Sequence, residues 1–203
     1  MVAIVDYGVG NLFSLKSSFA AIGVDVIVTA DPEVLKSADR IVLPGVGAFE
    51  DAAKKLRDSG LDKVLIELAN NGKLLLGICL GMQMLFEQSF EYGCHKGLGL
   101  LKGNIVPMKN SIPQDLKIPH IGWNALHITR ESELFKYIKP NDFVYFVHSF
   151  YATDCDESVI ATAEYGKELT AAVQKGNIIG CQFHPEKSGE VGLNILRAFC
   201  EMG

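Results

Sequence analysis

Residues 74–83 read L-L-L-G-I-C-L-G-M-Q and join an apolar run to a helix-like segment. A short apolar run that ends in a glycine-containing turn is typical of a buried parallel strand that leads into a helix. Cys79 stands in this turn, with Gly77 two residues before it and Gly81 two residues after it. Small neighbours allow a sharp turn and the close approach of another molecule. The pattern predicts a nucleophile elbow at Cys79, although by itself it fits a buried structural cysteine equally well.

The first half of the chain repeats this alternation of short apolar runs and helical segments. We expect strands at residues 2–5, 26–28, 41–43 and 74–76. Between them, two groups of apolar residues have the spacing of a helix face: Leu12, Leu15, Phe19 and Ile22, then Phe49, Ala52, Ala53 and Leu56. Strands that alternate with helices predict a mostly parallel central sheet flanked by helices, a three-layer α/β sandwich.

The second half, after Gly103, changes character. Strands are expected at residues 143–147, 159–163, 171–173 and 178–183, with turn signals at Gly166 and at residues 175–177. These closely spaced strands predict an antiparallel extension of the sheet. The chain is expected to close with a helix capped by Ser188. We expect a single domain over residues 1–203.

Composition excludes several classes of protein. The 203 residues are 48% hydrophobic and carry a net charge of −5, which argues against sequence-independent binding to nucleic acid or to anionic membranes. No apolar run approaches the roughly 20 residues of a membrane helix, and the start does not resemble a signal peptide. Five cysteines without a C-x-x-C pair fit a reducing, cytoplasmic compartment. No cluster has zinc-like spacing, so we expect neither a metal nor a cofactor.

A cysteine nucleophile needs a base and a group that orients the base. The sequence Q-F-H-P-E at residues 182–186 offers His184 and Glu186, which in an extended backbone project to the same side. His184 would take the thiol proton, and Glu186 would hold the imidazole in one tautomer. Alone, this motif also fits a buried histidine beside a surface glutamate. Together with the elbow, it favours a catalytic triad.

Two further segments could serve acyl transfer through a thioester. Gly45, Val46 and Gly47 follow the strand at residues 41–43, at the sheet edge where catalytic sites gather. With the amide of Leu80, this loop could bind a tetrahedral oxyanion, although it could equally be a plain strand-to-helix turn. Gln83 lies four residues after Cys79, on the same face of a helix. That position suits substrate binding.

With G-I-C-L-G-M-Q, P-G-V-G and Q-F-H-P-E, the chain resembles the class I glutamine amidotransferases over essentially its whole length. The resemblance implies that Cys79 is the nucleophile, His184 the base and Glu186 its orienting acid. It also implies a glutamine site formed by Gln83 and by the backbone around His148, Ser149 and Phe150.

Finer features are similar to the branch of this family that serves histidine biosynthesis. They are D-Y-G-V-G-N-L at residues 6–12, P-H-I-G-W-N at 119–124, Y-F-V-H-S-F-Y at 145–151 and H-P-E-K-S at 184–188. In that branch, a (β/α)₈ barrel cyclase consumes the ammonia and makes imidazole glycerol phosphate and AICAR. The resemblance implies that the face toward this partner is lined or supported by Asn11, Pro119, His120, Trp123, Asn124 and Lys187. Trp123, the only tryptophan, could otherwise pack in the core.

Three alternatives stay open at this point. The same glutaminase chemistry could serve a different ammonia-using synthase. A cysteine peptidase or stress protein could share the elbow, although it would lack H-P-E after a late strand. A non-catalytic binding module would need neither base nor acid.

Overall fold

The computed structural model describes residues 1–203, and its central feature is an eight-stranded sheet in the order β2-β1-β3-β4-β14-β13-β12-β9. The first five strands are parallel to one another: β2 (Val26–Thr29), β1 (Val2–Val5), β3 (Arg40–Leu43), β4 (Leu74–Ile78) and β14 (Ile178–Cys181). The remaining three pair antiparallel: β13 (Glu168–Lys175), β12 (Val159–Glu164) and β9 (His127–Ile128). The predicted parallel sheet with an antiparallel extension is therefore confirmed.

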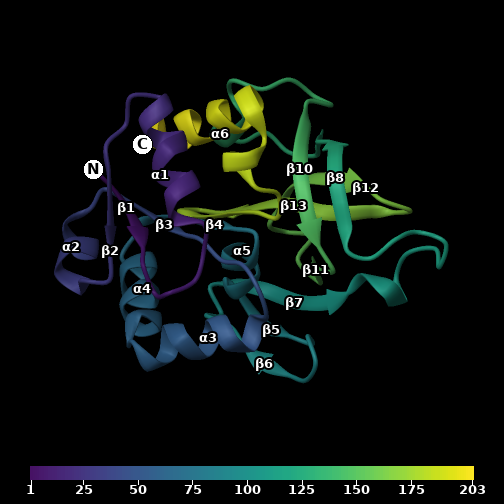
Figure 1. The fold of residues 1–203 in the computed structure, drawn as a ribbon, viewed down its shortest axis with the longest axis horizontal. Coiled ribbons are helices and arrows are strands. Elements are labelled where there is room, and N and C mark those ends of the chain that lie inside the picture. Colours follow the sequence, from purple (N-terminus) through teal and green to yellow (C-terminus); the bar gives the residue numbers. More distant parts are fainter.

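Helices cover both faces of this sheet, as Figure 1 shows. One face carries α1 (Leu12–Ala21) and α6 (Gly189–Glu201), and the other carries α2 (Pro32–Ser37), α3 (Phe49–Asp58) and α4 (Leu61–Asn70). Side chains of a strand alternate between the two faces. In β1, Val2 and Ile4 accordingly pack with α1 and α6, whereas Ala3 and Val5 pack with α3 and α4. This arrangement is the predicted three-layer sandwich.

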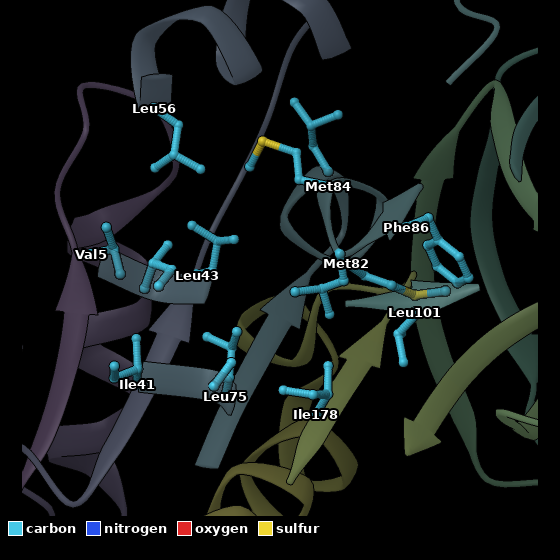
Figure 2. Close-up of a cluster of buried hydrophobic side chains, with 14 of the residues drawn as sticks. Val5, Ile41, Leu43, Leu56, Leu75, Met82, Met84, Phe86, Leu101 and Ile178 are labelled. Carbon is cyan, nitrogen blue, oxygen red and sulfur yellow. The ribbon is translucent and has the colours of Figure 1, made fainter. Parts of the chain in front are cut away.

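The core on the α3 side continues past the sheet (Figure 2). There Ile41, Leu43 and Leu75 of the central strands meet Met82 and Met84 of the short helix α5 (Leu80–Met84). This cluster extends to Phe86 and Leu101, which belong to a second sheet. That sheet has the order β11-β7-β5-β6 and comprises β11 (Phe150–Thr153), β7 (Leu101–Pro107), β5 (Phe86–Ser89) and β6 (His95–Lys96).

A two-stranded sheet of β10 (Phe143–His148) and β8 (His120–Ala125) lies on the α6 side. Three 3₁₀ turns complete the chain: η1 (Met108–Asn110), η2 (Glu133–Phe135) and η3 (Pro185–Lys187). None of the helices is both long enough and apolar enough to cross a membrane.

Two local predictions were wrong. The strand expected at residues 178–183 ends at Cys181: the Gln182 N–H still donates to Ala171 of β13, but the His184 N–H donates to Tyr145 of β10. Ser188 precedes α6 as predicted, but its hydroxyl does not cap the helix. It donates to the His184 carbonyl at 2.7 Å and accepts from the Tyr145 N–H at 2.9 Å, so it fastens η3 to β10.

The glycines beside Cys79 are required by close packing. A Cβ at Gly81 would lie 1.9 Å from the backbone oxygen of Leu43. A Cβ at Gly77 would lie 2.7 Å from the backbone of Gly81 and Met82. Both contacts are with backbone atoms, which cannot rotate away. The predicted need for small residues around the turn is confirmed, and its cause is the seating of α5 directly on β3 and β4.

We predict that Gly81→Ala lowers the free energy of unfolding by about 3 kcal/mol, because the added methyl group overpacks a rigid backbone contact. Urea denaturation measures the change. Gly72→Ala is the matched control: it adds a methyl group to open space at φ 86°, so only the backbone conformation costs energy, about 1 kcal/mol. Equal losses in the two variants would contradict the packing argument.

Candidate active site

Cys79 occupies the junction between β4 and α5 in an unusual backbone conformation. Its φ of 55° and ψ of −113° are rarely adopted by residues other than glycine. The backbone N–H donates to the Cys181 carbonyl of the adjacent strand β14 at 2.7 Å, which holds the turn in place. Only 8% of the residue is exposed. The turn presents the thiol at the carboxyl end of the parallel sheet.

His184 and Glu186 form a buried pair beside this turn. The Nδ1–H of His184 donates to Oε1 of Glu186 at 2.7 Å, and both side chains are nearly inaccessible. The pair comes together through η3 and not, as predicted, through an extended strand. Burial lowers the pKa of His184, but hydrogen bonds with Cys79 and Glu186, and the charges of both, raise it to about 9. The raised pKa favours the imidazolium form of His184.

Cys79 and His184 open onto one cavity of about 340 Å³. This is within the usual size range of small-molecule sites. The predicted site residues in its wall, besides these two, are Val46, Gly47, Leu80, Gln83, Pro119, His148, Ser149, Phe150 and Lys187. Segments that are far apart between residues 46 and 187 thus meet around a single cavity.

In the predicted oxyanion loop, residues 45–47, some residues line the cavity and others pack against the protein interior. Val46 and Gly47 line the cavity, and Gly47 has φ 90°. Gly45 does not line it but packs against α5, where a Cβ would lie 2.7 Å from the Gly81 nitrogen. The Tyr7 hydroxyl donates to the Pro44 carbonyl at 2.7 Å and anchors the start of the loop.

The side-chain amide of Gln83 forms hydrogen bonds within the wall of the cavity. Its Nε2 donates to the carbonyl of Phe150 at 3.2 Å and to Oε1 of Gln182 at 2.9 Å. Gln182 is fully buried, and its own Nε2 lies 3.8 Å from the sulfur of Cys79. Gln83 therefore connects the nucleophile's surroundings to the 148–150 segment.

Sequence reasoning missed four residues of the site, among them Val147, whose carbonyl oxygen lies 4.0 Å from the Cys79 sulfur. Glu91 and Tyr92, from the loop between β5 and β6, line the cavity. The side-chain amide of Gln182 contacts the sulfur of Cys79. Oε2 of Glu91 accepts from the Phe49 backbone N–H at 2.7 Å, and burial raises the pKa of this carboxyl. Gln182 could have been found, since it belongs to the Q-F-H-P-E motif. No local signal marks Glu91 or Tyr92.

The residues expected to face a partner are only partly exposed. Trp123 is 51% exposed and makes an edge contact with Tyr145, so it is not a core residue. Lys187 places its Nζ over the same Tyr145 ring at 5.7 Å. His120 is buried beneath the strand surface.

Of the other three, Pro119 and Asn124 adjoin or belong to β8, and Asn11 precedes α1. Pro119 precedes β8 and reaches the cavity. Asn124 donates to the Glu164 carbonyl at 2.9 Å. Asn11 begins α1 and accepts from the Ser14 N–H at 3.2 Å.

The chain is similar to known proteins along its full length. The family model for glutamine amidotransferase class-I matches residues 3–202. The imidazole glycerol phosphate synthase subunit HisH of Oceanobacillus iheyensis is 49% identical over 203 residues, covering 100% of this chain and 99% of the relative. The protein of the same name from Lactococcus lactis is 46% identical, with 98% of each chain covered.

Solved structures share the fold at lower identity. The chain matches a crystal structure of a glutamine amidotransferase with a TM-score of 0.77 and 20% identity, covering 99% of this chain and 98% of that one. It matches a structure of PurLQS from Thermotoga maritima with a TM-score of 0.75 and 21% identity, covering 98% and 96%. The chain belongs to the class I glutamine amidotransferase family and, within it, to the family of the HisH subunits of imidazole glycerol phosphate synthase.

Proposed function

We propose that this protein is the glutaminase subunit of an imidazole glycerol phosphate synthase, which hydrolyses glutamine and delivers ammonia to a cyclase in histidine biosynthesis. The observation that carries the proposal is the buried His184–Glu186 pair, which opens onto the same cavity as the strained Cys79 turn. The full-length similarity to HisH subunits supports the choice of synthase.

The first half of the proposed reaction forms a thioester. The Cys79 thiolate attacks the side-chain carbonyl carbon of glutamine, and the carbonyl becomes a tetrahedral oxyanion. His184, as imidazolium, donates its proton to the leaving nitrogen, and ammonia departs with the C–N bond pair. Glu186 stabilises the imidazolium and keeps its Nδ1–H directed away from the substrate. A γ-glutamyl thioester and a neutral His184 remain.

The second half regenerates the enzyme. Neutral His184 takes a proton from water, and the resulting hydroxide attacks the thioester carbonyl. The C–S bond breaks, glutamate leaves, and the thiolate–imidazolium pair returns. Gly47 and Leu80 line the cavity together with Cys79, and their backbone N–H groups are our candidate donors to the oxyanion.

The cavity also suits the other end of glutamine. Glu91 is the carboxylate in its lining and is our candidate for the substrate's α-ammonium group. Gln83, His148, Ser149 and Phe150 line the same cavity. A ligand that carries a primary amide and an ammonium group could therefore place its amide at Cys79 and its ammonium group at Glu91.

A partner subunit would receive the ammonia, and we propose that it is a (β/α)₈ barrel cyclase. The proposed contact face contains exposed apolar side chains beside the cavity mouth: Ile118, Ile121, Trp123 and Phe143 are each at least 40% exposed. Pro119 and Lys187 link this face to the cavity, because both belong to its wall. A subunit seated here would cover the route by which ammonia leaves.

We predict that 6-diazo-5-oxo-norleucine, a glutamine-like electrophile, labels Cys79 and that glutamine protects against labelling. Peptide mapping by mass spectrometry identifies the adduct, and Cys79→Ala should abolish it. Cys94 is exposed and serves as an internal control for general thiol reactivity. An adduct on Cys94 in preference to Cys79 would contradict the site assignment.

The pH profile of kcat/KM for glutamine should show an alkaline limb near pH 9, because His184 must keep its proton and its pKa is raised to about 9. Glu186→Gln removes an interaction that raises this pKa, so the limb should move to lower pH. Glu190→Gln, an exposed position at the start of α6, is the matched control. An alkaline limb that stays in place in Glu186→Gln would refute the assigned role of Glu186.

We expect Trp123→Ala to weaken binding of the cyclase subunit by roughly 30-fold, since buried tryptophans at interfaces commonly contribute about 2 kcal/mol. Isothermal titration calorimetry measures the affinity. Ile27→Ala, on the edge strand β2 at the opposite end of the sheet from β9, is the control with comparable exposure. If both variants bind the cyclase equally well, the partner face has been misplaced.

A further inference from the structure

Two buried histidines face each other across the two-stranded sheet. In the β8–β10 register His120 pairs with His148, and the two strands run side by side in Figure 1. Nδ1 of His120 lies 3.1 Å from Nε2 of His148, a hydrogen-bond distance. His120 is 1% exposed and His148 is 7% exposed. Neither takes part in the catalytic steps proposed above.

The outer contacts of the pair determine where two of its protons lie. Nδ1 of His148 lies 2.8 Å from the carbonyl oxygen of Phe150, which can only accept, so this nitrogen carries a proton. Nε2 of His120 lies 2.7 Å from Oδ1 of Asn124. Nδ2 of Asn124 donates to the Glu164 carbonyl, and reversing the amide would bring two oxygens together. Nε2 of His120 therefore carries a proton as well.

The inner contact requires a third proton. Two neutral imidazoles hold two ring protons between them, and the outer contacts use both. The remaining nitrogens would then face each other with lone pairs only. One additional proton turns this repulsive contact into an N–H···N hydrogen bond.

We propose that His120 and His148 form a buried imidazole–imidazolium pair with three ring protons and that this pair positions the wall of the catalytic cavity. The Phe150 carbonyl accepts from both His148 and Gln83. Gln83 continues to Gln182, whose Nε2 approaches the Cys79 sulfur. The pair thus begins a polar chain that ends at the nucleophile. The positioning role rests on the proposed glutaminase function, whereas the proton count does not.

Aromatic stacking and the contact with Asn124 favour a positive charge on His120, whereas burial opposes a charge on either ring. The His120 ring is stacked on Tyr165, with centroids 4.0 Å apart, and on Phe146, at 5.1 Å. Aromatic faces within about 6 Å attract a cation. Burial lowers the pKa of both rings, and nearby His120 and His184 further lower the pKa of His148, to about 4. The hydrogen bond to Asn124 raises the pKa of His120.

Nitrogen NMR of the full chain labelled with ¹⁵N-histidine tests the proton count at pH 7.5. Three of the four ring nitrogens of the pair should be protonated. In His120→Phe, which keeps the ring volume, His148 should retain only its Nδ1 proton. Should that variant not fold, Asn124→Leu removes the outer acceptor and should leave two protons on the pair. One proton on each ring in the unmodified protein would overturn the proposal, as would two on each.

The rate at which 6-diazo-5-oxo-norleucine labels Cys79 in the isolated chain tests the positioning role. His120→Phe should slow labelling about tenfold, the effect of losing one hydrogen bond to a charged group. His127→Phe, an exposed histidine on β9, is the matched control and should label at the original rate. An unchanged rate in His120→Phe overturns the positioning role. Absence of labelling in the unmodified protein would count against the glutaminase function and leave the proton count intact.

Discussion

The backbone of Cys79 is the constraint on which the site depends. A residue with a Cβ at φ 55° costs about 1–2 kcal/mol, and surrounding contacts must offset that cost. They are the hydrogen bond from the Cys79 N–H to Cys181 and the packing of α5 on β3 and β4. Gly77 and Gly81 make that packing possible. The sulfur is therefore held where substrate can reach it, before any substrate is bound.

The sheet order explains how distant residues meet at this point. β14 pairs parallel with β4, so the segment that follows β14 leaves the sheet beside the β4–α5 turn. Hydrogen bonds of the Ser188 hydroxyl then join η3 to β10. They place His184 and Glu186 close to residues 148–150 of the cavity wall. The short distance between His184 and Glu186 and their burial make the electrostatic interaction strong. Interactions with Cys79 and with Glu186 raise the pKa of His184, despite the opposing effect of burial.

The sequence predicted the parallel half of the fold well, because its strands are short apolar runs separated by regular helical patterns. It predicted the accessory sheets poorly. β5, β6 and β8 carry polar residues such as Gln88, Lys96 and Asn124, and these strands form by pairing with distant segments instead of following a local apolar pattern. The prediction that Ser188 caps α6 was also wrong, because its hydroxyl is hydrogen-bonded to Tyr145 and His184 instead.

Within the site, sequence alone identified the residue types that chemistry demands: a cysteine between glycines, a histidine and a nearby carboxylate. It was right about the His184–Glu186 pair but for a wrong geometric reason, because a 3₁₀ turn replaces the expected strand. Glu91, Tyr92 and the buried pairing of His120 with His148 were identified only from the tertiary structure. Their significance lies in contacts between segments far apart in the chain, and no local pattern of residues encodes such contacts.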